Sequence, residues 1–182
     1  TKGVGVEKDY GEAMKWLRQA ADRGNAEAEL MVGDLFRHGL GVAEDPSEAA
    51  EWYLKAADHG NPEAEDTLGC MYMNGEGVER DPGMALGLFK AAAEQGESGA
   101  LLHIGRFCYE AADGDEDLRE AAEWYRMAAE KGEPAAAYDL GVMYLNGEGV
   151  GQDSSEALRL FRSAAEQGMP QAQYNLALMY KN

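Results

Sequence analysis

The sequence has little positive charge, few prolines and no long apolar segment. Its 182 residues include 16 Lys and Arg against 34 Asp and Glu, which gives a formal net charge of −18. Because nucleic acids and anionic membranes are bound through basic residues, this balance argues against both as ligands. No apolar run approaches the length of about 18 residues that a membrane-spanning helix needs, so we expect no membrane insertion.

The sequence also lacks the motifs that carry common enzyme chemistry. No serine begins an S-x-x-K motif, and neither G-x-S-x-G nor H-E-x-x-H occurs. The G-E-G-V segments lack the lysine of a phosphate-binding loop. The acidic series Asp113, Asp115 and Asp117 lacks the Gly and the Glu that a calcium loop requires. We therefore expect no catalytic residue, no metal site and no cofactor.

Glycine and alanine are abundant, and they recur at a fixed spacing. The motif A-A-x-x-G ends at five glycines that follow one another at intervals of 36 residues: Gly24, Gly60, Gly96, Gly132 and Gly168. This spacing defines four full repeats, 25–60, 61–96, 97–132 and 133–168, flanked by partial repeats at 1–24 and 169–182. Such a period is typical of solenoids, whose repeats bury their apolar faces on their neighbours.

Each repeat predicts two amphipathic helices, helix A and helix B. Helix A has a core stripe of apolar residues at repeat positions 4, 8, 11 and 12. Glycine at position 9 costs helix stability, so we expect it to admit a bulky ring from a neighbouring helix: Gly33, Gly69, Gly105 and Gly141. Helix B has its stripe at positions 25, 28, 29, 32 and 33, which predicts a core location for Trp16, Trp52 and Trp124.

The ends of the helices also have recurrent signals. Position 21 predicts the N-cap of helix B in each repeat: Asp9, Asp45, Asp81, Asp117 and Asp153. A G-x-G-V segment joins helix A to helix B, and its glycines predict a helix end and a tight turn. The third repeat has residues 111–114, A-A-D-G, in its place, so we expect a loop of different shape there.

The motifs A-x-x-x-L-G-x-x-Y, G-x-G-V, D-x-x-x-A and A-A-x-x-G, recurring at one spacing, resemble the Sel1-like repeat family, a relative of tetratricopeptide repeats. The resemblance covers essentially the whole chain. It implies an all-α fold in which about ten helices form a right-handed α/α superhelical solenoid over residues 1–182. It also implies a non-catalytic adaptor. Some small family members with paired cysteines have been linked to penicillin binding. This chain lacks their cysteine spacing and shows no nucleophile–base pair, so a penicillin-binding hydrolase is a remote alternative.

A second stripe of helix A, at positions 3, 6, 10, 13 and 14, varies between repeats. Related tetratricopeptide arrays present the corresponding stripe along a concave groove. We predict a peptide-binding groove formed by Asn74, Arg106, Tyr109, Tyr138, Val142, Leu145, Asn146, Tyr174 and Leu178. Asn182 is a further candidate for hydrogen bonds to a peptide backbone. The stripe is acidic in the N-terminal repeats, so the predicted partner is a protein or peptide with basic and apolar segments.

Several alternatives remain open at this point. The rings of the second stripe could pack against neighbouring helices A, and the Asn residues beside Gly could simply end helices. The chain could act as a structural spacer in a larger repeat protein, or it could self-associate, because both ends fall within a repeat. The two cysteines, which are predicted to point apart, do not decide between a cytoplasmic and a bacterial periplasmic location, although the absence of a cysteine framework disfavours the small exported members of the family.

Overall fold

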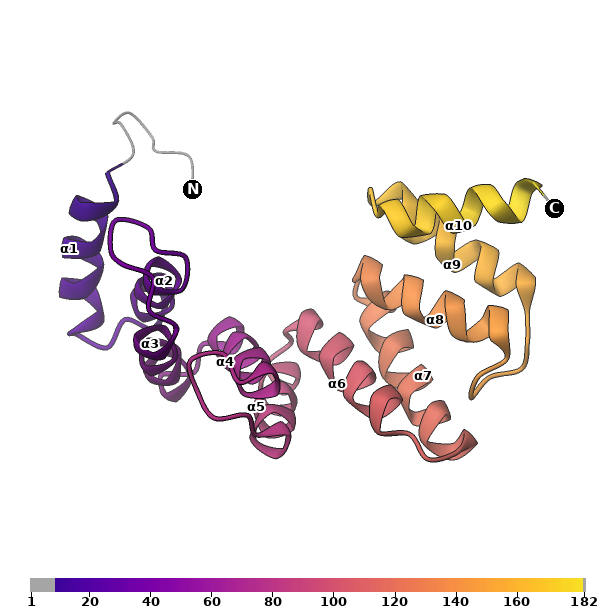
Figure 1. The fold of residues 1–182 in the computed structure, drawn as a ribbon, viewed down its shortest axis with the longest axis horizontal. Coiled ribbons are helices and arrows are strands. Elements are labelled where there is room, and N and C mark those ends of the chain that lie inside the picture. The colour runs from indigo at the N-terminus through magenta and orange to yellow at the C-terminus, as the bar shows by residue number, and fades with distance from the viewer. Residues whose placement is uncertain (1–8, 182) are drawn as a thin grey trace. The chain divides into compact units, whose positions relative to one another are not determined.

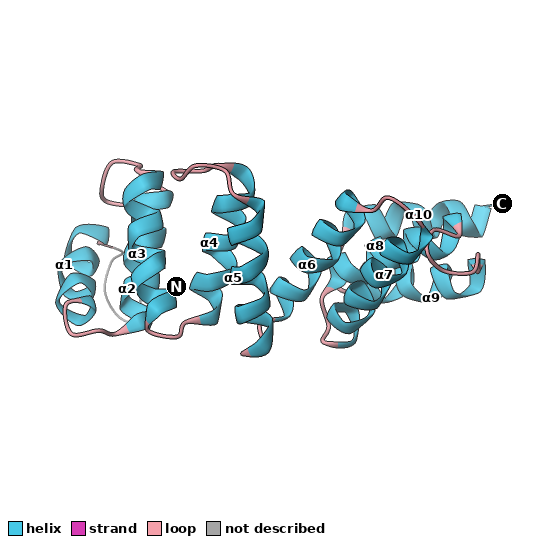
Figure 2. Ribbon diagram, turned by 90° about the horizontal axis from the view of Figure 1, so that it is seen from below, coloured by secondary structure: helices cyan, strands magenta, loops and turns pink. Residues whose placement is uncertain are grey.

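A computed structural model of the chain describes residues 9–181, which contain ten helices and no strand (Figures 1 and 2). Their order is the predicted one: a helix B, four A–B pairs and a final helix A. The helices are α1 (Tyr10–Ala21), α2 (Ala26–Arg37), α3 (Pro46–Asp58), α4 (Pro62–Asn74), α5 (Pro82–Glu94), α6 (Ser98–Ala111), α7 (Asp115–Glu130), α8 (Pro134–Asn146), α9 (Ser154–Glu166) and α10 (Pro170–Lys181). The first G-x-G-V segment, at residues 3–6, and Asn182 lie outside the described residues.

The helices form two compact parts, an N-terminal half, Thr1–Gly96, and a C-terminal half, Glu97–Asn182. Within each half, the extensive contacts join helices that follow one another in the chain, such as α8 with α9 and α9 with α10. Figure 1 shows these last three helices as successive layers. This nearest-neighbour packing is that of a solenoid. One continuous array over residues 1–182 stays a prediction, and each half is described by itself below.

The predicted Asp caps are confirmed in four helices. Asp9, Asp45, Asp81 and Asp153 accept hydrogen bonds from backbone N–H groups in the first turns of α1, α3, α5 and α9. The G-x-G-V glycines and the repeat-ending glycines have positive φ, as the turn interpretation requires.

Asp117 is the exception, and its assignment as an N-cap was wrong. Without the G-x-G-V turn, α6 continues to Ala111, and α7 begins early, at Asp115, behind the N-cap Gly114. Asp117 therefore lies inside the first turn of α7, where its carboxylate accepts a hydrogen bond of 2.9 Å from the N–H of Asp113. The expectation of a different loop in the third repeat is thus confirmed.

The glycines at position 9 do admit aromatic rings, as predicted. A Cβ atom on Gly141 would lie 2.8 Å from the ring of Phe161, and Tyr53, Phe89 and Tyr125 meet the equivalent glycines. These rings belong to position 29 of helix B, one residue after the tryptophans. Because successive helical residues point about 100° apart, the tryptophans face away from this contact. Trp16 is 61% exposed, so its predicted core location was wrong, while Trp52 and Trp124 are half-buried.

Helix A carries a buried carboxylate in the first two full repeats, and each has a polar partner at the end of the following helix B. Glu29 Oε2 lies 2.7 Å from His59 Nδ1, and Glu65 Oε2 accepts a hydrogen bond of 2.7 Å from Gln95 Nε2. Burial raises the pKa of Glu65, and the bond from Gln95 opposes this shift. The same role is therefore filled by His in one repeat and by Gln in the next.

This equivalence predicts that His59→Ala lowers the free energy of unfolding by about 1–3 kcal/mol, because it removes a polar partner from a buried carboxylate. His59→Gln copies the neighbouring repeat and is expected to cost less than about 1 kcal/mol. Urea unfolding followed by circular dichroism measures both. Equal losses in the two variants would show that the contact with Glu29 contributes little.

Candidate peptide-binding site

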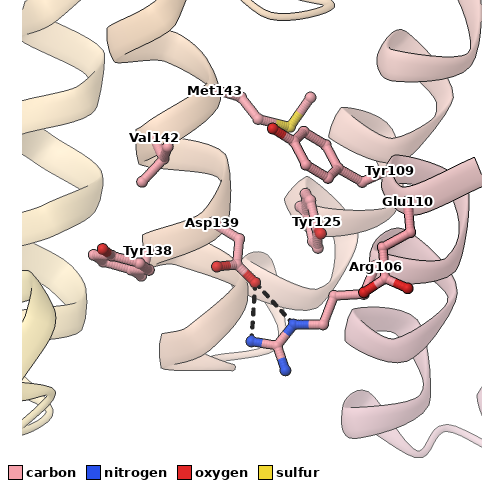
Figure 3. Close-up of a pocket in the computed structure, with 8 residues that line it drawn as sticks. All are labelled: Arg106, Tyr109, Glu110, Tyr125, Tyr138, Asp139, Val142 and Met143. Atoms are coloured by element: carbon pink, nitrogen blue, oxygen red, sulfur yellow. Dashed lines mark hydrogen bonds and ion pairs between the residues drawn. The ribbon is translucent and has the colours of Figure 1, made fainter. Parts of the chain in front are cut away.

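Four of the predicted groove residues meet in one hollow of the C-terminal half, which we call the tyrosine pocket. It has a volume of about 300 Å³ and lies between α6, α7 and α8. Figure 3 shows its lining residues: Arg106, Tyr109, Glu110, Tyr125, Tyr138, Asp139, Val142 and Met143. Arg106, Tyr109, Tyr138 and Val142 were predicted, so the sequence pattern identified half of this lining.

Helical periodicity explains why these residues come together. Tyr109 and Glu110 follow Arg106 by three and four residues along α6, so both lie on the same face of that helix as Arg106. Tyr138 and Val142 have the same relation on α8. Tyr125 forms the floor, because its ring is held against Gly105 of α6. The pocket is thus a product of two neighbouring repeats.

An ion pair spans the pocket from α6 to α8. The Nε and Nη2 atoms of Arg106 both lie 3.0 Å from Oδ2 of Asp139, as the dashed lines in Figure 3 show. Burial raises the pKa of Asp139, and the guanidinium of Arg106 opposes the shift. Burial also raises the pKa of Tyr125, and the nearby charge of Asp139 adds to this effect. The pocket therefore holds a partly desolvated carboxylate beside neutral aromatic rings.

Tyr109 links neighbouring repeats as well as lining the pocket. Its hydroxyl donates a hydrogen bond of 2.8 Å to Glu148, in the G-x-G-V loop of the next repeat, and this bond raises the pKa of Tyr109. Arg37, at the same repeat position, donates bonds of 2.8 and 2.9 Å to Glu76, which lowers the pKa of Glu76. Position 13 therefore has a structural role that the groove interpretation did not include, although Tyr109 stays 37% exposed.

The other predicted residues lie outside the pocket. Asn74 and Asn146 are the last residues of α4 and α8, each followed by a left-handed Gly that caps the helix. Asn146 also donates a hydrogen bond of 3.3 Å to Glu148, which fits the alternative role at a helix end. Leu145 is half-buried beside it. Asn74 belongs to the N-terminal half, so it is not placed relative to the pocket.

The predicted residues of α10, Tyr174 and Leu178, are exposed by 66% and 39%. Their helix reaches the pocket through Asn175, whose amide donates a hydrogen bond of 3.4 Å to the hydroxyl of Tyr138. The second stripe is not exposed throughout, however, because Leu30 and Leu102 at position 6 are buried.

Sequence reasoning missed Asp139, Tyr125 and Met143 as pocket residues, whereas Glu110 lies on the predicted second stripe, at position 14, but was not among the predicted groove residues. Tyr125 and Met143 belong to the apolar core pattern, which hides any second role. Asp139 follows Tyr138 at the border between the two stripes of helix A. A carboxylate at this border in an otherwise apolar helix was the one signal that could have pointed to it.

The comparisons with known proteins agree with the repeat pattern. The Sel1 repeat family model matches residues 1–25, 26–61, 62–97, 98–133, 134–169 and 170–182. Each of these repeats ends one residue later than the repeat defined by the A-A-x-x-G spacing, except the last, which ends with the chain. The chain belongs to the Sel1 repeat family. Sel1 repeat proteins are generally protein-interaction scaffolds, and their solenoid fold is typically non-catalytic. The search of curated proteins found no match.

Two solved Sel1 repeat structures are similar over nearly the whole chain. A Sel1 repeat protein from Oxalobacter formigenes is 36% identical, with 98% of this chain and 73% of that chain covered and a TM-score of 0.91. The protective antigen c5321 of uropathogenic Escherichia coli is 33% identical, with 97% and 38% covered and a TM-score of 0.86. This Sel1 repeat chain thus spans well under half of the antigen. Among residues 9–181, no helix is long and apolar enough to cross a membrane.

Proposed function

We propose that this Sel1 repeat protein is a non-catalytic adaptor that binds a peptide or protein segment on the helix A faces of its C-terminal half. The observation that carries the proposal is the tyrosine pocket, where Tyr109, Tyr138 and Val142 meet in one hollow. Exposed aromatic and apolar groups around a depression are the usual centres of binding energy in protein interfaces.

The neighbouring surface of α10 supports the same proposal. Tyr174 and Leu178 are exposed on this helix, which contacts the pocket residue Tyr138 through Asn175. A segment with one side chain in the pocket could therefore continue along α10. The volume of the pocket lies at the lower end of the range for small-molecule sites, and it suits one or two side chains.

The double variant Tyr138→Ala with Val142→Asp tests this placement. It removes one ring and puts a charge into the hollow, so binding of partners is expected to weaken by about a hundredfold or more. The measurement is quantitative capture of proteins from a native extract on the immobilised full chain. Circular dichroism is expected to show unchanged helix content.

The matched control is Trp124→Ala with Met127→Asp, which makes the same kinds of change at residues outside the pocket lining. Partners that use the proposed site are lost with the first variant and kept with the control. If partners bind the Tyr138→Ala, Val142→Asp variant as strongly as they bind the natural chain and the control, the pocket is not the binding site.

Self-association is a second candidate, favoured by exposed rings on the first and last described helices. Trp16 on α1 and Tyr174 and Tyr180 on α10 are all more than half exposed. Light scattering over a range of concentrations tests this candidate, because stacking through these faces would raise the average mass. A monomer at high concentration would remove it.

A further inference from the structure

The tyrosine pocket combines aromatic walls with negative charge. Tyr109, Tyr125 and Tyr138 supply the rings, and Asp139 and Glu110 supply carboxylates. The faces of aromatic rings attract cations, and the attraction grows when water is excluded. A long side chain with an apolar stem and a positive end would satisfy both features of this lining.

The charges around the pocket favour a cation even with Arg106 present. Arg106 is the single basic residue of the lining, against two carboxylates, and a third carboxylate, Glu148, accepts a hydrogen bond from the lining residue Tyr109. Both nitrogens of Arg106 approach the same oxygen of Asp139, so the second carboxylate oxygen takes no part in this ion pair. The raised pKa of Asp139 indicates that one guanidinium does not offset the burial of this carboxylate.

An acidic occupant fits the same site poorly. Arg106 would be its natural partner, but this guanidinium already faces Asp139, and Glu110 and Glu148 would repel a second anion. The whole chain carries a formal net charge of −18, which attracts basic segments and repels acidic ones at long range.

We infer that the tyrosine pocket receives the side chain of a Lys or Arg from a basic segment, and that Arg106 is the internal cation that this side chain displaces from Asp139. This inference rests on the proposed function, because it names the chemistry of the segment that the adaptor binds. In the absence of a partner, Arg106 neutralises Asp139. When a partner binds, its cation takes that place between the tyrosine rings.

A library of displayed random dodecapeptides is selected for binding to the full chain, and the enriched peptides are the probes. Enriched peptides are synthesised with each Lys replaced by norleucine or each Arg by citrulline, which remove the charge and keep the stem. One basic position is expected to matter most, with a loss of roughly tenfold in affinity for its neutral replacement, measured by fluorescence anisotropy.

Two variants separate the inferred role of Arg106 from a structural one. Asp139→Asn is expected to weaken the basic peptide roughly tenfold and to leave its neutral form unchanged. Arg106→Met removes the competing cation and is expected to strengthen the basic peptide several-fold, on the order of three to ten. Glu123→Gln makes the same charge change as Asp139→Asn at an exposed site of α7 outside the pocket, and it should alter affinity less than about twofold.

The outcomes distinguish this inference from the proposed function. If enriched peptides depend on Tyr138 and Val142 but bind equally well without their charges, the pocket takes an apolar group and the inference is wrong. Weaker binding to Arg106→Met would likewise overturn it, because Arg106 would then contact the partner directly. If no enriched peptide distinguishes the natural chain from the Tyr138→Ala, Val142→Asp variant, the proposed function fails as well. If Asp139→Asn loses helix content, the peptides with norleucine or citrulline and the Arg106→Met variant still show whether the pocket receives a cation.

Discussion

Gly149→Ala is expected to lower the free energy of unfolding of the C-terminal half by about 2–4 kcal/mol. Gly149 has a φ of +64°, and an added Cβ would lie 2.4 Å from the carbonyl carbon of Leu118 and 2.6 Å from its oxygen. These are backbone atoms of α7, which cannot rotate away as a side chain could. The left-handed conformation costs about 1–2 kcal/mol for a residue with a Cβ, and overpacking costs about 1–3 kcal/mol.

The same loop offers the control. Gly151 has no atom within 4 Å of an added Cβ and is not among the residues with positive φ. Gly151→Ala should therefore change stability by less than about 1 kcal/mol, and it can be stabilising, because Ala restricts the unfolded chain. Urea unfolding followed by circular dichroism measures both variants. Equal losses would mean that the approach of this loop to α7 is not what requires glycine.

Phe161→Ala is expected to have the second large effect, a loss of about 3–5 kcal/mol. Phe161 is fully buried in α9, and its ring lies against Gly141. The centroids of the Phe161 and Tyr138 rings are 5.6 Å apart. Truncation removes this buried surface and leaves a cavity that the rigid helix pair fills only in part. Thermal and urea unfolding should both show a lower midpoint.

Met127→Ala is the comparison for Phe161→Ala. Met127 is also a large apolar residue of the C-terminal half, but it is 45% exposed on α7. Its truncation should change stability by about 0.5 kcal/mol or less. If Phe161→Ala were no more harmful than this control, the ring and glycine contact would not be the main support of the helix pair.

The order and ends of the helices could be predicted because they depend on local interactions. An Asp before an apolar stripe can cap a helix without any tertiary contact, as at Asp45 and Asp153, and a Gly at a turn can adopt positive φ. The cap at Asp117 was predicted wrongly because the preceding loop had changed, which allowed α7 to begin earlier. Local signals are thus reliable only where the repeat keeps its standard loop.

The candidate site could be predicted in part. Arg106, Tyr109, Tyr138 and Val142 share a pocket because residues three or four apart lie on one face of a helix. The same reasoning predicted a core location for Trp16, but this side chain is exposed in the structure. Positions 28 and 29 of helix B are both apolar, and the pattern alone did not show which of them would meet the glycine of helix A.

The sequence by itself therefore determined the 36-residue repeat, the ten helices and the contact between glycine and a ring. The tertiary structure alone decided which residues pair across repeats. Arg106 meets Asp139, 33 residues away, and Tyr109 meets Glu148, 39 residues away. Periodicity sets which face a side chain occupies, whereas these pairs depend on how far one repeat is rotated and shifted against the next. That offset is set by packing between helices, and it leaves a pocket at the tyrosines.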